Sequence, residues 1–293
     1  MLLLPKVKGQ YKPAGVPKIN WSHPLAKGLL FYVFDTGLGT IVELVKNTPS
    51  TISGTVPSVV SSPWGSGFSY NASASIKFVP DAEIIAATTG INYSFAAAYN
   101  KTGTVGSYTS VFLRDANNGG SQPYINWRIE INNAGSGQDR TNVSWCTNLN
   151  VEGDSTAKTG LNNNTYHTIV GVMTTVPAGN VTAYADGAQF YNVNTAVGHN
   201  NTNSNIYLGY GSFVGLIYYA AFWGRVLTVK EQFLLHYKPY DFLIFPANIS
   251  LPVDQEIYNP NAAPIDPGLF ISNTPYYHFR NKRNNRINIR SRR

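Results

Sequence analysis

The sequence predicts an all-β protein, an antiparallel β-sandwich with one short helix near its C-terminal end. Three observations indicate this class. Strand-like runs recur at about 10–15 residue spacing, with clusters of Gly, Asn and Ser between them. Only 13% of the residues are charged, about half the usual share, which does not suit long solvent-exposed helices. The segment 124–131 alternates apolar and polar residues, as a half-buried antiparallel strand does.

The strands expected first along the chain lie at residues 29–34, 75–79, 93–99 and 108–114. In the segment 124–131 one face carries Ile125, Trp127, Ile129 and Ile131, and the other carries Asn126, Arg128 and Glu130. The run 214–223 is apolar on both faces. It should therefore lie in the middle of the sandwich or under another segment.

The last third of the chain contains a hairpin and then the helix. Asp186 and Gly187 stand between two strand-like runs, and this pair favours a tight turn because Gly supplies a positive φ. Thr228 can cap a helix of about residues 229–237, with Glu231 completing a capping box. Three apolar residues then share one helix face, namely Val229, Phe233 and Tyr237, and Lys238-Pro239 ends the helix.

This order of strand, turn, strands and capped helix resembles the end of a laminin G-like domain of the concanavalin A-like lectin/glucanase superfamily. Residues 92–99 and 166–172 resemble two of its core strands. The segments 19–29, 225–228 and 238–240 are similar to the ends of laminin G-like proteins of tailed-bacteriophage virions. The resemblance covers residues 19–245 and implies a jelly-roll sandwich. Because this fold hosts many functions, a function must be argued from a site.

Three parts of the chain are expected. Residues 1–18 form an extended basic arm, 19–245 the sandwich, and 246–293 an extended Pro-rich tail with a basic end. That end holds seven of the chain's 22 cations and no acid: Arg280, Lys282, Arg283, Arg286, Arg290, Arg292 and Arg293. Tyr276 and Tyr277 precede them as apolar anchors. The tail is expected to bind an acidic groove of a virion protein; nucleic acid and a merely solvated tail are the alternatives.

Catalytic residues are not expected. Glycanases of this superfamily place acids at alternate positions of one strand, so that two carboxyl groups meet across the glycosidic bond. Here the closest pairs are Asp81/Glu83, Glu152/Asp154 and Asp254/Glu256, and all three have turn-like surroundings. None of the five histidines has metal-ligand spacing, and His167 is expected to be packed or hydrogen-bonded in the sandwich. Cys146 is expected to be a small buried residue.

Glycan or calcium binding would use the loop after the fourth strand. Asp115, Asn117, Asn118 and Tyr108 offer the carboxylate, amide and aromatic groups that sugars need, and Trp64 and Trp145 are further aromatic candidates. No cofactor is expected. Calcium, the recurrent ion of the superfamily, is an option to which Asp115, Asp139 or Asp154 could each give one ligand.

The chain's compartment follows from three features. The apolar run at residues 2–4 is too short for a signal peptide, no segment could span a membrane, and the single cysteine allows no internal disulfide. We therefore expect a protein made in the host cytoplasm, without contact to membranes.

The leading hypothesis is a non-enzymatic structural protein of a tailed-phage virion, in the head decoration, a fibre, the tail or the neck. Its partners would be other virion proteins and further copies of itself. The alternative is a carbohydrate-binding module for the host surface, and an endoglycanase is less favoured.

Overall fold

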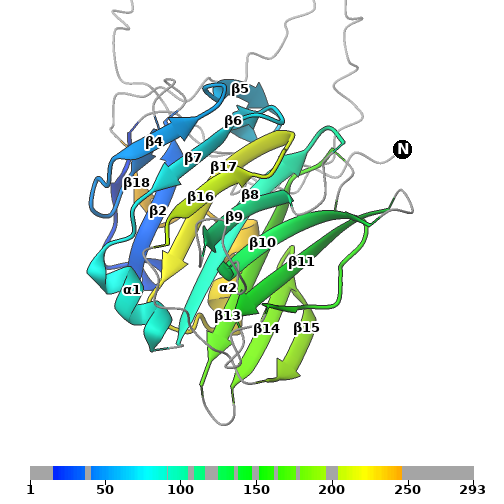
Figure 1. The fold of residues 1–293 in the computed structure, drawn as a ribbon. Helices are drawn as coiled ribbons and strands as arrows, with labels where there is room; N and C mark the ends of the chain where they lie inside the picture. The colour runs from blue at the N-terminus through cyan, green and yellow to red at the C-terminus, as the bar shows by residue number, and fades with distance from the viewer. Residues whose placement is uncertain are drawn as a thin grey trace, which may run out of the picture. The chain divides into compact units, whose positions relative to one another are not determined.

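The computed structural model describes residues 16–36, 41–90, 92–104, 109–115, 125–134, 138–146, 152–161, 164–175, 179–195 and 204–245. Two antiparallel sheets pack against each other, which confirms the predicted class (Figure 1). The smaller sheet has seven strands in the order β12-β11-β10-β9-β16-β7-β4. Its strands are Glu152–Asp154 (β12), Gln138–Cys146 (β11), Ile125–Ala134 (β10), Thr109–Asp115 (β9), Ile206–Tyr210 (β16), Ser75–Phe78 (β7) and Ser50–Ser53 (β4).

The larger sheet has nine strands. Seven of them follow the order β15-β14-β13-β8-β17-β2-β3, while β6 pairs with β17 and β5 with β6. They are Ala188–Asn194 (β15), Asn180–Ala185 (β14), His167–Thr174 (β13), Tyr93–Lys101 (β8), Gly215–Trp223 (β17), Leu29–Asp35 (β2), Ile41–Glu43 (β3), Gly65–Tyr70 (β6) and Ser58–Ser62 (β5). As its two apolar faces predict, β17 is central and every residue of it is buried.

The predicted hairpin is confirmed. Asp186 and Gly187 join β14 to β15, and both have positive φ values, of 52° and 79°. Gly187 adopts this conformation without a Cβ clash, and Asp is among the few other residues that tolerate it.

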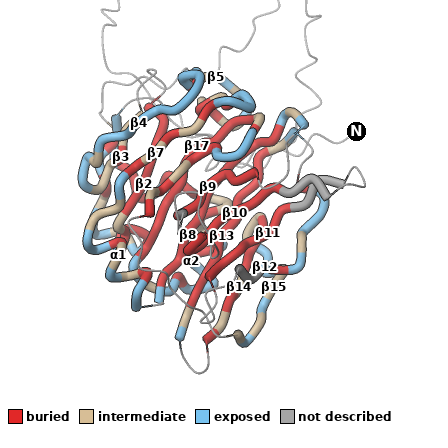
Figure 2. Tube along the Cα trace, viewed as in Figure 1, coloured by how far each residue is buried: buried red, intermediate tan, exposed pale blue. Residues whose placement is uncertain are grey.

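The main core lies between the two sheets. Aromatic side chains fill its centre, where the ring of Trp127 lies 4.7 Å from that of Phe95 and 5.4 Å from that of Phe222. Figure 2 shows the central strands buried along most of their length and the exposed residues gathered at turns and at β4 and β5.

A second core covers the outer face of the larger sheet. Alternate residues of its strands, such as Tyr32, Tyr219 and Trp223, pack there against segments from both ends of the domain. Those segments include a 3-10 helix, Pro24–Ala26 (η2), the helix Val229–Tyr237 (α2), and a two-stranded ladder of Lys18–Ile19 (β1) with Leu243–Ile244 (β18). The larger sheet is therefore apolar on both faces, and neither face is open to solvent over this area.

Helix α2 has the predicted capping box. The Thr228 side chain accepts from the Glu231 N–H, and the Glu231 carboxylate accepts from the Thr228 N–H at 2.8 Å. The apolar face set by the sequence spacing is the outward one: Val229 is 65% and Phe233 48% exposed. The buried residues are Glu231, Gln232 and Leu235, because the polar ones are held by the hydrogen bonds described below.

A second α-helix, Ala82–Thr89 (α1), was not expected from the sequence. Asp81 caps it by accepting from the Ile84 N–H at 2.9 Å. Lys46 forms ion pairs with Asp81 at 2.6 Å and Glu83 at 3.0 Å. This acid pair thus belongs to a helix start, which favours negative charge.

Candidate functional site: a polar network on the seven-stranded sheet

Five polar residues form a network on the outer face of the smaller sheet. Arg128 and Glu130 come from β10, Asn142 and Ser144 from β11, and Asp154 from β12; we call them the outer polar network. The strand register places them side by side, with Arg128 opposite Ser144, Glu130 opposite Asn142, and Ser144 opposite Asp154. Because side chains alternate across a strand, these residues face away from Trp127 and the main core.

One carboxylate oxygen organises the network. Arg128 Nη2 donates to Glu130 Oε2 at 2.6 Å, and Asn142 Nδ2 donates to the same oxygen at 3.2 Å. Asn142 Nδ2 also lies 3.4 Å from Asp154 Oδ1, and Arg128 Nε lies 3.3 Å from Ser144 Oγ. Glu130 Oε1 is buried without a hydrogen-bond partner among the described residues.

The polar face of β10 is buried, which corrects the prediction of a half-buried strand. Asn126 and Glu130 are each 1% exposed and Arg128 is 6% exposed. Burial raises the pKa of Glu130; the Arg128 charge opposes this rise, and the Asp154 charge adds to it. The charged groups on this buried face therefore pair with each other, Arg128 with Glu130, and not with solvent.

Glu130 and Asp154 form a carboxylate pair that sequence spacing missed, because 24 positions separate them. The pair considered from the sequence, Glu152 and Asp154, lies on the short strand β12 and not in a turn as predicted. Asp154 is bonded through Asn142 to Glu130 instead. The one available signal was the alternation of charged and amide side chains on two successive strands.

Solvent reaches only one end of the network. Asp154 is exposed, whereas Glu130 is buried in its ion pair. Tyr191 on the edge strand β15 is near enough for Asp154 to contribute, after burial, to a raised tyrosine pKa. The Tyr191 ring also lies 6.0 Å from that of Trp145. An exposed carboxylate, an amide and a half-buried aromatic ring can together bind hydroxyl-rich ligands. General acid catalysis would additionally require Glu130 to reach a substrate.

Most of the site residues expected from the sequence lie outside the described residues. This holds for Tyr108, Asn117 and Asn118, for Asp254/Glu256, and for the whole basic tail with Tyr276, Tyr277 and the cations from Arg280 to Arg293. Asp115 ends β9 opposite Ile125. Asp139 pairs with Asn133 in the ladder of β11 with β10.

His167 makes the structural contacts expected of it. Its Nδ1 lies 2.8 Å from Asp186 Oδ2 and its Nε2 lies 2.8 Å from Thr165 Oγ1. His236 on α2 lies 2.6 Å from Thr168 Oγ1 on β13. It lies 3.5 Å from Asp186 Oδ1 in the β14–β15 turn. Burial lowers the pKa of His236, which the Asp186 charge opposes. His167 on β13 and His236 on α2 thus both contact the Asp186 carboxylate of the β14–β15 turn.

The other candidates also have structural partners. His23 caps η2 by accepting from the Leu25 N–H at 3.2 Å. Cys146 is buried, and burial raises the pKa of its thiol to about 11, so the thiol is neutral at physiological pH. Trp64 stacks on Tyr166 with ring centroids 6.4 Å apart, and Trp145 is only 3% exposed.

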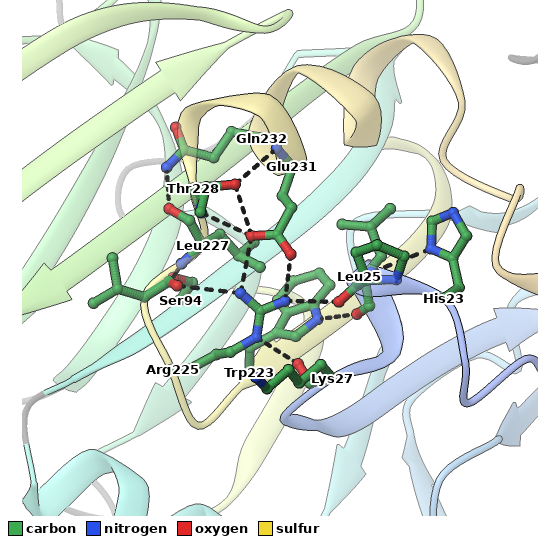
Figure 3. A network of polar contacts seen from close by, with 12 residues as sticks. His23, Leu25, Lys27, Ser94, Trp223, Arg225, Leu227, Thr228, Glu231 and Gln232 are labelled. Atoms are coloured by element: carbon green, nitrogen blue, oxygen red, sulfur yellow. Dashed lines mark hydrogen bonds and ion pairs between the residues drawn. The ribbon is translucent and has the colours of Figure 1, made fainter.

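The two end segments that resemble phage proteins meet in one polar cluster, the end clamp (Figure 3). Arg225 donates to the carbonyl oxygens of Pro24 at 2.9 Å and Lys27 at 2.5 Å, and it also binds the Glu231 carboxylate at 2.6 and 2.9 Å. Trp223 Nε1 donates to the Leu25 carbonyl at 2.7 Å. These contacts join positions about 200 residues apart in the chain.

The segment after Arg225 is fixed to the larger sheet as well. The Leu227 N–H donates to Ser94 Oγ at 3.0 Å, and Gln232 Nε2 donates to the Leu227 carbonyl at 2.7 Å. The end clamp thereby fastens α2 and η2 to β8 and β17. The side-chain donors of Trp223, Arg225 and Gln232 named here all bond within the domain, so the clamp's role is architectural.

The described part of the chain holds no group of three or more His, Cys, Asp or Glu side chains placed to bind a metal ion. It also holds no helix that is long and apolar enough to cross a membrane.

No protein-family model and no curated protein matches this chain. Among solved structures it is similar to domain 4 of AbnA, a GH43 extracellular arabinanase from Geobacillus stearothermophilus, in complex with arabinotriose. The identity is 16% and the TM-score 0.53, over 71% of this chain and 98% of that one.

Two toxin domains are similar as well. They are the binding domain of Paraclostridial Mosquitocidal Protein 1, with 13% identity and a TM-score of 0.55, and that of botulinum neurotoxin serotype C1, with 12% and 0.54. The similarity covers 74% and 72% of this chain, and about half of each toxin domain, 53% and 52%. At these identities the likeness shows the fold alone, an antiparallel β-sandwich.

Proposed function

We propose that the protein is a non-enzymatic structural component of a tailed-phage virion, in which a laminin G-like sandwich is anchored by its terminal arms. The end clamp carries this proposal. The two segments on which the resemblance to phage proteins rests are joined by hydrogen bonds (Figure 3), as expected if they were inherited together. The arabinotriose complex of AbnA domain 4 and the similarity to two toxin binding domains support a binding role at a coarser level.

The anchor would be the basic tail. Its seven cations from Arg280 to Arg293 would bind an acidic surface of a neighbouring virion protein, and Tyr276 and Tyr277 would add apolar contacts beside them. If duplex DNA were the partner instead, log affinity would fall with log salt at a slope near −6, at about 0.9 per phosphate contact. The salt slope therefore separates a protein groove from packaged nucleic acid.

The test is incorporation into phage particles. A chain that ends at His278 should be lost from purified particles, and so should a full-length chain with the seven cations replaced by Gln. The Gln chain keeps the tail length and both tyrosines, so it isolates charge. Normal occupancy of both variants, measured by quantitative mass spectrometry of the particles, would contradict the anchoring role.

A glycan-binding role is the second candidate, favoured by the exposed end of the outer polar network. Asp154 offers an exposed carboxylate and Tyr191 a half-buried aromatic ring near it, while the Asn142 amide is buried and bonded to Asp154. On a glycan array, Asp154→Asn and Tyr191→Ala should each abolish a signal that Asp241→Asn, at an exposed acid beyond α2, leaves intact. Calcium should be included and omitted in parallel. If the unaltered protein gave no signal on the array, the glycan-binding role would be rejected and the virion role would remain.

Absence of glycoside hydrolysis is part of the proposal. Glu130 and Asp154 are the acid pair to test, because Glu130 has the raised pKa of a general acid. Reducing-end release from bacterial polysaccharides should stay at background. Release that Glu130→Gln abolishes would instead make the protein an endoglycanase.

A further inference from the structure

Arg114 is a second buried arginine, on the opposite face of the smaller sheet from Arg128. It is the last residue but one of β9, and its neighbours across the ladders are Trp127 on β10 and Ile206 on β16. Both neighbours belong to the main core, so the Arg114 side chain points between the two sheets. Its exposed fraction is 0%.

Among the described residues, the guanidinium of Arg114 has no hydrogen-bond acceptor. None of its three nitrogens, Nε, Nη1 and Nη2, finds a partner among the described residues. Arg128, by contrast, binds the Glu130 carboxylate at 2.6 Å. Arginine offers five N–H donors and stays protonated, so a buried guanidinium must find an acceptor to offset its desolvation.

Two residues near Arg114 carry further unsatisfied donors: Trp127, its partner across the ladder, and Tyr93, on which its charge acts. Tyr93 Oη and Trp127 Nε1 are both buried without a partner in the described part of the chain. Their rings stack on Phe222, each with a centroid separation of 5.4 Å. The Arg114 charge also acts on the Tyr93 hydroxyl, and burial lowers the pKa of Arg114 to about 10.

These donors gather at one end of the sandwich. Tyr93 begins β8, Phe222 is the last residue but one of β17, and Arg114 holds the same position in β9. The neutral, buried Cys146 thiol beside Tyr93 supplies no negative charge. What is missing is therefore an acceptor that carries charge.

We propose that Arg114, Tyr93 and Trp127 form an internal binding site for one small oxyanion, a carboxylate or a phosphate. The planar guanidinium fork binds such groups through two parallel hydrogen bonds, and the tyrosine and indole donors complete the shell. A cation does not fit, since the site consists of donors. The bound anion neutralises the buried charge, so the folded protein is more stable with the anion than without it.

The experiment measures thermal unfolding of the full chain in a low-anion buffer, with sodium acetate or sodium phosphate titrated in. At a concentration of about one hundred times Kd, the unfolding temperature should rise by about 5–10 °C. Acetate and phosphate distinguish a carboxylate from a phosphate ligand. Titration calorimetry with the more effective salt should give one site per chain.

Arg114→Met supplies the matched comparison. It keeps the side-chain volume and removes the charge, so it should unfold at or above the temperature of the unaltered protein in low-anion buffer. Its unfolding temperature should also lack the rise caused by anion binding, and should show only the stabilisation that such salts give to proteins in general. If the methionine variant fails to fold, Tyr93→Phe takes its place in the test. It removes a single donor and should weaken anion binding several-fold. Equal responses of the unaltered protein and both variants would overturn the site.

Discussion

The two sheets cover their outer faces by opposite means. The larger sheet carries aromatic residues such as Tyr32 and Trp223 under α2 and the end segments, in a second apolar core. The smaller sheet carries the ion pair of Arg128 with Glu130, buried just as deeply. Apolar burial is non-directional and contributes stability directly. A buried ion pair must first offset the desolvation of both charges.

This difference separates the roles of the two faces. The larger sheet's outer face is committed to architecture, because the end clamp and α2 fill it. The outer polar network is expected to contribute little net stability, because desolvation of its charges offsets their attraction. It extends to the exposed Asp154. A costly arrangement at a surface edge is where a binding function is expected.

Breaking the ion pair tests this comparison most strongly. Arg128→Met should destabilise the fold by about 3–5 kcal/mol, because Glu130 is left buried and unpaired. The double variant Arg128→Met with Glu130→Leu should recover most of that loss. Urea unfolding of both variants gives the two free energies. A double variant as unstable as the single one would mean that the network itself stabilises the fold.

The end clamp should respond differently. Arg225→Ala removes charge-assisted hydrogen bonds to two carbonyls and to Glu231, for a loss of about 1.5–3 kcal/mol. No second substitution should restore it, since the carbonyls of Pro24 and Lys27 lose their donor in any case. Thr228→Ala, which removes only the helix cap, should cost about 0.5–2 kcal/mol. If Glu231→Leu restored the stability lost in Arg225→Ala, the end clamp would behave as the outer polar network is expected to, and this comparison would fail.

The smallest expected effect concerns pH and α2. Burial lowers the pKa of His236, so the unfolded chain binds this proton more tightly than the folded one does. The stability from His236 is therefore complete above pH ~6.5 and falls as the pH drops, by less than about 1.4 kcal/mol per unit. His236→Asn should flatten this difference between urea midpoints at pH 7.5 and 5.5. Parallel pH profiles would assign the loss to other groups.

Regular patterns made much of the fold predictable. The alternation in β10, the two apolar faces of β17 and the turn of Asp186 with Gly187 are local signals, and each gave a correct element. Helix α1 was missed because Asp81 was interpreted as one of a pair of loop acids and not as a helix cap.

The candidate site was less predictable, because its parts are distant in sequence. Glu130 and Asp154 meet only through the pairing of β10, β11 and β12, and the alternation in β10 could not show that its polar face is buried. The same holds for Arg114, which local pattern placed on a strand but could not orient against Tyr93. The expected loop and tail sites lie outside the described residues and stay predictions.

The ladder of β1 with β18 has a mechanical consequence. Lys18 pairs with Ile244 and Ile19 with Leu243, so the chain enters and leaves the domain at adjacent positions. A load applied through both ends would open this two-residue ladder one pair at a time, like a zipper. Resistance would then pass to the bonds of Trp223 with Leu25 and of Arg225 with Pro24, while the two sheets carried little tension. Both ends of the described domain therefore lie side by side.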